Sequence, residues 1–313
     1  MLFIFLRIFA SILYVISGFI KKTVNISTDL QCAIGAVIPL LIMPIILYVI
    51  YKKNPSLFKI KDETFKHLSV NPFKNIFSIE SLYLTIPSLC SYISYIILLR
   101  ALPISVISTI SPMYIIFSMI FNKLLIHTKI TANKIISIII VLFGVIFANF
   151  KNILKDIKKI KSKFIIPLIL IWLTLTAFQI SYSKYLLNGI DFVEVVAMDY
   201  ILGGIIFLFG FIIYNLFIKR QKYTYDVKSI GLLVLLSIMG VFASLSRYDA
   251  LQHIPAYLSI LIGNIKLPLT LLISLFWLKE NVNIYKVIGA ICIIFGISYS
   301  DIEPRVMDIF RDI

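Results

Sequence analysis

Cysteine, histidine and acidic residues are scarce in this chain. Its 313 residues include 3 cysteines, 3 histidines and only 15 aspartates and glutamates together. The cysteines lie inside apolar runs without metal-ligand spacing, and the histidines are scattered near the predicted loops. We therefore expect no disulfide framework, no metal site and no bound cofactor.

Motifs of nucleotide-binding and hydrolytic enzymes are missing as well. The sequence has no GxGxxG pattern and no P-loop to hold phosphate groups. It also has no Ser/His/Asp arrangement that would support nucleophilic catalysis. We therefore expect neither ATP-driven transport by this chain alone nor an enzyme.

Apolar residues, in contrast, are abundant. Hydrophobic residues make up 60% of the chain and charged residues 14%, which indicates a multi-pass protein of the lipid bilayer rather than a soluble domain. The net charge of +15 comes from short loops between apolar runs, so no nucleic-acid partner is expected. Apolar runs predict about ten membrane-spanning helices, at residues 2–20, 29–51, 78–99, 104–126, 133–150, 164–187, 192–218, 229–251, 254–278 and 284–300.

Internal repetition organises these helices. At an offset of 152 positions the matches are Pro103 with Pro255, Lys134 with Lys286, Phe143 with Phe295 and Gly144 with Gly296. A second offset, of 163, aligns Lys184 with Lys21. Because each half has an odd number of helices, the two halves must cross the bilayer in opposite directions. We therefore expect an all-α integral membrane fold of two inverted five-helix repeats.

The expected division of the chain follows from this repetition. Residues 1–150 form the first repeat and residues 164–300 the second, joined by the basic linker 151–163 and followed by the short tail 301–313. Residues 52–77 are rich in lysine and polar residues and predict a solvated loop that includes an interfacial helix. Basic residues are balanced between the two sides, so the positive-inside rule leaves the orientation open.

One lysine near the middle of an apolar span is the strongest functional signal. Lys266 lies within residues 253–280, at a depth where an unpaired charge costs at least ~2.5–3.5 kcal/mol. It shares a helix face with Ser259 and Thr270, so this face is polar inside the membrane. Pro268 predicts a kink within a turn of the charge. We expect Lys266 to bind substrate or to form a structural ion pair.

Other predicted helices carry polar residues of the same kind. Asp199 lies about two turns inside the seventh predicted helix, where we expect a coupling residue or the ion-pair partner of Lys266. Arg247, near the end of the eighth, either binds substrate or extends to the membrane interface. Further candidates for substrate binding on other helices are Tyr14, Tyr92, Tyr95, Trp172 and Gln179.

The repeated segments resemble the EamA-type repeats of the drug/metabolite transporter superfamily. The second half matches that pattern at Ala250, Leu251, Pro255, Ala256, Glu280, Gly289 and Gly296. The first half matches in part, at Ala101, Leu102 and Pro103, and has Thr128 where the pattern has glutamate. The resemblance implies ten helices, cytoplasmic termini and a central cavity between the two halves.

These observations predict a secondary-active transporter that moves a small organic solute by alternating access. Because Lys266 and Arg247 are cationic, we expect a solute with a carboxylate or phosphate, including zwitterions such as amino acids. One alternative is a proton-coupled exporter of cationic or amphipathic compounds, and a more remote one is an intramembrane lipid-handling protein or enzyme. We expect the protein in the cell membrane, plasma or inner, and leave its oligomeric state open.

Overall fold

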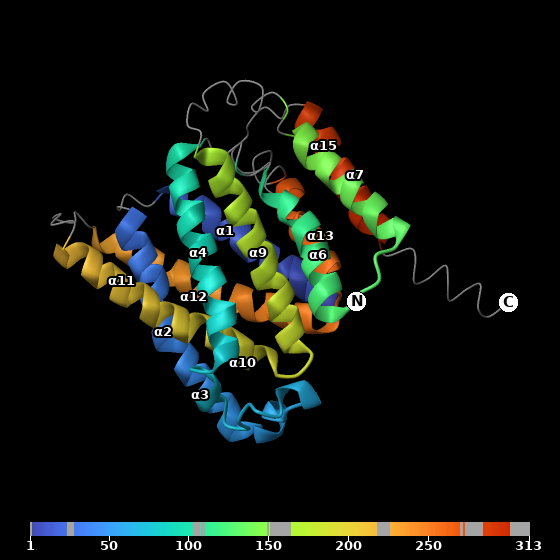
Figure 1. The fold of residues 1–313 in the computed structure, drawn as a ribbon. Helices are drawn as coiled ribbons and strands as arrows, with labels where there is room; N and C mark the ends of the chain where they lie inside the picture. The colour runs from blue at the N-terminus through green and yellow to red at the C-terminus, as the bar shows by residue number, and fades with distance from the viewer. Residues whose placement is uncertain are drawn as a thin grey trace. The chain divides into compact units, whose positions relative to one another are not determined.

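A computed structural model describes most of the chain. The described residues are 2–23, 28–102, 107, 110–148, 150, 164–217, 226–269, 272 and 284–300. Within these ranges the chain forms helices joined by turns, without strands (Figure 1). The predicted all-α class is therefore confirmed. The linker 151–163, the tail 301–313 and Thr270 lie outside the described residues.

Five helical segments of the described chain are long and apolar enough to cross a membrane. They lie in α2 (Thr28–Lys53), α4 (Ile79–Ala101), α9 (Ile165–Leu187), the continuous segment Phe192–Phe217, and α12 (Val227–His253). Shorter apolar stretches lie within or around α1 (Leu2–Thr23), α6 (Tyr114–Ile126), α7 (Ala132–Ala148), α13 (Ala256–Gly263) and α15 (Ile284–Ser300). These lengths and compositions are those of an integral membrane protein.

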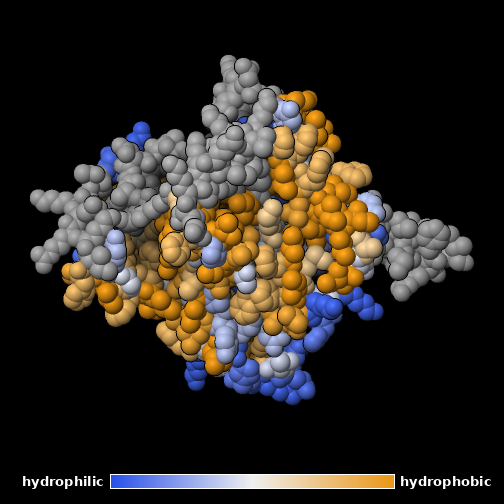
Figure 2. Space-filling view, turned by 45° about the horizontal axis from the view of Figure 1, so that its top comes forward, coloured by the Kyte–Doolittle hydropathy of each residue, from blue (hydrophilic) through white to orange (hydrophobic). Residues whose placement is uncertain are grey.

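Large apolar side chains cover the outer faces of these helices. On α2, Leu41 and Ile45 are 60% and 65% exposed, and on the Phe192–Phe217 segment Phe209 is 68% exposed. Most of the surface described in Figure 2 is accordingly hydrophobic. Exposed apolar area of this extent is unfavourable in water, so these faces are suited to contact with lipid.

The chain divides into two compact units that are not continuous in sequence. The first unit consists of Met1–Leu89 and Tyr182–His253, and the second of Cys90–Ser181 and Ile254–Ile313. Each unit therefore combines residues of both predicted repeats. The helices α4 and α9 contribute residues to both units.

In the first unit, α12 is the central element. Helix α1 packs along it, and α2 and α10 (Phe192–Ala197) also contact it. Leu233 and Leu236 of α12 are buried with Ile34 of α2 packed against them. Helix α10 begins at Asp191, whose side chain accepts a hydrogen bond from the Val193 backbone N–H at 3.0 Å. This is an N-cap, as the acidic residues of this region predict.

The segment between α2 and α4 is only partly solvated. It forms the 3₁₀ helices η1 (Pro55–Phe58) and η2 (Glu63–Phe65) and the short helix α3 (Pro72–Asn75). Phe58 and Phe65 are each only 2% exposed, so the prediction of a solvated loop is wrong for these two residues. The ring of Phe65 lies where a side chain at Gly189 would project: a Cβ there would be 2.0 Å from Phe65 Cδ2.

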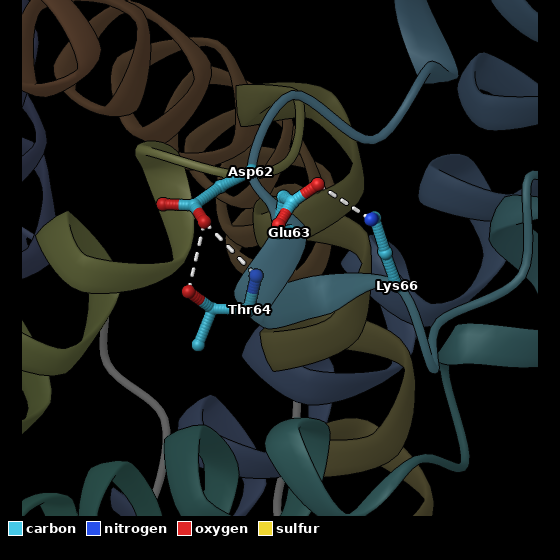
Figure 3. Close-up of polar contacts among 4 residues, drawn as sticks. All are labelled: Asp62, Glu63, Thr64 and Lys66. Atoms are coloured by element: carbon cyan, nitrogen blue, oxygen red, sulfur yellow. Dashed lines mark hydrogen bonds and ion pairs between the residues drawn. The ribbon is translucent and has the colours of Figure 1, made fainter.

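The exposed rim of this segment is held by local polar contacts. Asp62 accepts hydrogen bonds from the Thr64 backbone N–H at 2.9 Å and from its hydroxyl at 2.8 Å, while Lys66 pairs with Glu63 at 2.6 Å (Figure 3). The two bonds from Thr64 favour the charged carboxylate and hold the pKa of Asp62 below its usual value. They fix the start of η2.

In the second unit, α7 and α15 approach until their backbones nearly touch. A Cβ on Gly144 of α7 would lie 2.7 Å from the carbonyl oxygen of Gly289 on α15. A Cβ on Gly296 would lie 3.1 Å from the carbonyl oxygen of Ser137. Only glycine permits such contacts, and small residues serve this purpose between membrane helices. Ile115, Ile138, Val141, Val145, Ile180, Ile260, Leu261 and Ile293 form the adjoining core.

Candidate functional site

The Phe192–Phe217 segment changes its winding at its most polar point. Helix α10 passes into a π-helical turn, η4 (Met198–Leu202), and then into α11 (Gly203–Phe217). Asp199 lies in this turn and is half-buried. The Gly203 N–H donates to the carbonyl oxygens of both Asp199 and Tyr200. A π turn accommodates an extra residue in a helix and is frequently found at functional sites.

Two tyrosines meet at one serine beside this turn. Tyr200 and Ser244 of α12 are hydrogen-bonded at 2.6 Å, and Tyr14 of α1 bonds the same Ser244 hydroxyl at 3.0 Å. Ser244 is 5% exposed, whereas Tyr14 is 37% exposed. Three helical elements of the first unit thus share one hydroxyl.

Tyr248 connects a carboxylate and a guanidinium in the same unit. Its hydroxyl donates to Asp199 Oδ2 at 3.5 Å and accepts from the Ser183 hydroxyl at 3.4 Å. The Arg247 guanidinium lies 5.6 Å from the centre of the Tyr248 ring, within the range of a cation–π contact. Opposite charges on two membrane-spanning segments therefore contact one aromatic side chain.

The end of α12 that carries this group is anchored by a lysine. Lys184 Nζ donates to the carbonyl oxygens of Leu251 at 2.7 Å and Gln252 at 2.9 Å. A cation at a helix C-terminus satisfies carbonyl groups that lack partners in the helix and interacts favourably with the helix dipole. The position of the last turn of α12 is thereby fixed relative to α9.

Three of the predicted site residues come together in the first unit. Tyr14 is hydrogen-bonded to Ser244 of α12. Asp199 accepts a hydrogen bond from Tyr248 of the same helix, and Arg247 contacts the Tyr248 ring. Sequence reasoning did not select Tyr200 or Tyr248. Their positions in the sequence could have indicated them, because each directly follows a charged residue of the predicted site.

Four further candidates lie in the second unit: Tyr92, Tyr95, Trp172 and Gln179. The rings of Tyr95 and Trp172 are 5.5 Å apart, and Trp172 is 7% exposed. Thr176 donates to the Trp172 carbonyl oxygen at 2.7 Å and is hydrogen-bonded to Ser91 at 2.6 Å. Tyr92 is 42% exposed, and Gln179 is half-buried on α9. The structure thus brings Tyr95 and Trp172 together.

Lys266 follows a break in its helix. Helix α13 ends at Gly263, the Asn264 side chain donates back to the Ile260 carbonyl oxygen at 3.1 Å, and the Leu267 N–H donates to the Asn264 carbonyl oxygen at 3.0 Å. The interruption lies within a turn of Pro268, as the missing proline N–H predicts. Ser259 is 3% exposed, whereas the Lys266 side chain is exposed. Lys266 and Asp199 belong to different units, so their pairing stays a prediction.

Comparison with known proteins relates the second half of the chain to membrane transporters. Residues 163–300 match the family model described as the EamA-like transporter family. A search of curated proteins gave no match. One solved structure, described as "Crystal structure of protein", is 12% identical and superimposes with a TM-score of 0.71, covering 97% of this chain and 98% of that chain. At this identity the likeness shows the fold. Residues 163–300 are thus similar to a family of membrane transporters, as the resemblance of the second half to drug/metabolite transporters indicated.

Proposed function

We propose that the protein is a secondary-active carrier that moves a small organic solute across the cell membrane by alternating access. The observation that carries this proposal is the contact of Asp199 and Arg247 with Tyr248 inside apolar, membrane-spanning helices. Each charge at membrane depth costs at least ~2.5–3.5 kcal/mol. The contact of two opposite charges with Tyr248 is therefore costly, and a helix bundle without a transport function has no need of it.

The charges suit a solute that carries a carboxylate or phosphate, including a zwitterion. In this proposal Arg247 and Lys266 bind the anionic group, because guanidinium and ammonium groups donate charge-assisted hydrogen bonds to such oxygens. Asp199 acts as the coupling residue or binds an ammonium group. Polar and aromatic side chains complete the site: Tyr14, Tyr92, Tyr95, Trp172, Gln179, Ser259 and Thr270.

The contact between α7 and α15 supports a ten-helix carrier built from inverted repeats, 1–150 and 164–300. Shifting Gly144 by 152 positions gives Gly296, and shifting Ser137 by the same number gives Gly289. The contact of Gly144 with Gly289 therefore has its counterpart in the contact of Gly296 with Ser137. Such exchanged pairs are what a two-fold axis between the segments produces. From the first contact to the second, residue numbers fall along α7 and rise along α15. The two helices are therefore antiparallel, as inverted topology requires.

A second candidate is proton-coupled export of cationic or amphipathic compounds. It is favoured by the position of Asp199, a half-buried carboxylate that accepts a hydrogen bond from Tyr248 within a π turn. In that mechanism Asp199 gains and loses the coupling proton, and the cationic compound replaces it. Substitution of Asp199 by Asn would then abolish transport and its dependence on the proton gradient together.

Transport in proteoliposomes tests the carrier. Vesicles containing the full chain are loaded with unlabelled amino acids and assayed for counterflow of a labelled amino-acid mixture. Arg247→Gln should lower the rate at least about tenfold, because a charge-assisted hydrogen bond is worth about 1.5–3 kcal/mol. Asp62→Asn, which removes an exposed loop carboxylate, is the control. Counterflow at the control rate in Arg247→Gln would overturn this assignment, and lipid turnover in place of solute uptake would favour a lipid-handling protein.

A further inference from the structure

The chain from residue 75 to residue 85 contacts the helix of Asp199 at two separate points. We propose that Asn75, Ser81 and Thr85 are positioning residues that hold the π turn in register and so fix the direction of the Asp199 carboxylate. The inference rests on the proposed role of Asp199 in transport.

The first contact holds the beginning of α10. Asn75 Nδ2 donates to Glu194 Oε1 at 2.6 Å, and the two residues are 3% and 2% exposed. Asn75 is itself held on both sides: Nδ2 donates to the Ser69 carbonyl oxygen at 2.6 Å, and Oδ1 accepts from the Ser69 N–H at 2.8 Å. Because both ends of the amide are occupied, the position of Glu194 is defined.

The second contact holds the beginning of the π turn. The hydroxyls of Ser81 and Thr85, one turn apart on α4, both donate to the Met198 carbonyl oxygen, at 3.5 and 3.4 Å. Both residues are fully buried, so water cannot replace this acceptor. A Cβ on Gly203 would lie 3.3 Å from Thr85 Cγ2, so α4 also lies close to the other end of the turn.

Register matters here because of the geometry of a helix. Relaxation of a π turn to α-helix removes one residue from the turn and rotates the following residues by about 100° relative to the preceding ones. The Asn75 contact with Glu194 precedes the turn, and the Tyr200 contact with Ser244 at 2.6 Å lies within it. Both contacts can form at the same time only while the π turn keeps its extra residue. In this proposal the Ser81 and Thr85 hydroxyls, which belong to α4, stabilise the π turn by donating to the Met198 carbonyl oxygen.

Chemical labelling of Asp199 measures this effect without transport. The full-length protein in detergent is treated with a hydrophobic carbodiimide, and the modification rate of Asp199 is followed by mass spectrometry. One neutral hydrogen bond changes a local equilibrium by roughly two- to tenfold, so the double variant Ser81→Ala/Thr85→Val should label Asp199 faster by a factor of that size. Ser81→Ala/Thr85→Ser restores one hydroxyl and should return the rate toward wild type.

Two controls make the outcome decisive. Thr176→Val removes a hydroxyl from the second unit and should leave Asp199 labelling unchanged. The exposed Asp226 serves as the internal reference for reagent activity. If Ser81→Ala/Thr85→Val folds and labels Asp199 at the wild-type rate, the positioning role is wrong. Should that variant not fold, Asn75→Ala replaces it, with the same expectation and the same refuting result.

The experiment also separates this inference from the proposed function. Asp199→Asn is assayed for counterflow in parallel with the labelling. Normal counterflow in Asp199→Asn, with faster labelling in Ser81→Ala/Thr85→Val, would refute the transport role of Asp199 and leave the geometric role of α4 supported. Lost counterflow with unchanged labelling would refute the role of α4 alone.

Discussion

Gly144 on α7 and Gly289 on α15 meet without any side chain between them. A Cβ added to Gly144 would stand 2.7 Å from the Gly289 carbonyl oxygen, and one added to Gly289 would stand 2.5 Å from that of Gly144. Both are backbone carbonyl oxygens, so neither can move unless its helix moves as well. Substitution at either position therefore acts on the spacing of two whole helices.

Gly144→Ala should lower the free energy of unfolding by about 1–3 kcal/mol, because overpacking a close contact forces backbone shifts. Thermal unfolding of the purified protein in detergent measures the change. Gly231→Ala on α12 is the matched control, since no atom lies within 4 Å of its Cβ position. That control should be neutral or stabilising, as alanine favours helix over glycine. Equal destabilisation of both variants would show that the contact has no special role.

The packing of Phe65 on Gly189 predicts a compensating pair of substitutions. Gly189→Ala should be strongly destabilising, because its Cβ would lie 2.0 Å from a ring carbon of Phe65, which is only 2% exposed. Phe65→Ala should cost about 3–5 kcal/mol through the cavity it leaves. Combining Gly189→Ala with Phe65→Leu should recover part of the stability, since the smaller side chain makes room for the methyl group. A double variant whose two effects simply add would contradict this packing.

Lys266→Met tests whether the lysine serves a ligand or a buried pair. If Lys266 binds an anionic solute, the variant should fold at least as well as the wild type while counterflow is lost. If Asp199 is its partner, stability should instead fall by ~3–5 kcal/mol, and Asp199→Asn in the same chain should restore it. Thermal unfolding and counterflow of both single variants and the double variant distinguish the two. A stable variant with a normal transport rate would exclude both roles.

Asp191 predicts a dependence of stability on pH. Burial raises the pKa of this capping carboxyl, partly offset by the bond from the Val193 N–H and by Lys61. Because the folded-state pKa lies above the ordinary value, the folded protein holds this proton more tightly than the unfolded chain. The contribution of Asp191 to stability is therefore greatest below the ordinary pKa and is lost as pH rises through the folded pKa.

Asp191→Asn keeps an oxygen that can cap α10 and removes the charge. The stability of the variant relative to the wild type should be higher at about pH 7 than at about pH 3, values that lie above and below the ordinary aspartate pKa. Melting temperatures of both proteins at the two pH values test this. A difference that stays constant with pH, or that favours the wild type more at the higher pH, would contradict the assignment.

Apolar run length predicted the all-helical class, because the cost of unpaired backbone groups in lipid leaves few alternatives. The interruption beside Lys266 was also predictable, since Pro268 lacks the N–H that a continuous helix requires. The π turn at Asp199 was not, because the hydroxyls that contact the Met198 carbonyl oxygen belong to Ser81 and Thr85, more than a hundred positions away in sequence. Composition also indicated a solvated loop where Phe65 is buried, since its partner Gly189 has no side chain to reveal the contact.

The hydroxyl of Ser244 carries a single proton, yet two tyrosines bond to it. Ser244 can donate to Tyr14 while accepting from Tyr200, or the reverse, and the heavy atoms occupy the same positions in both cases. The hydrogen bonds among the three hydroxyls can therefore point in either of two directions while the oxygen positions stay the same. Reversal inverts a local dipole next to Asp199 without moving a helix, so the electrostatic environment of the carboxylate can change faster than any rearrangement of the fold.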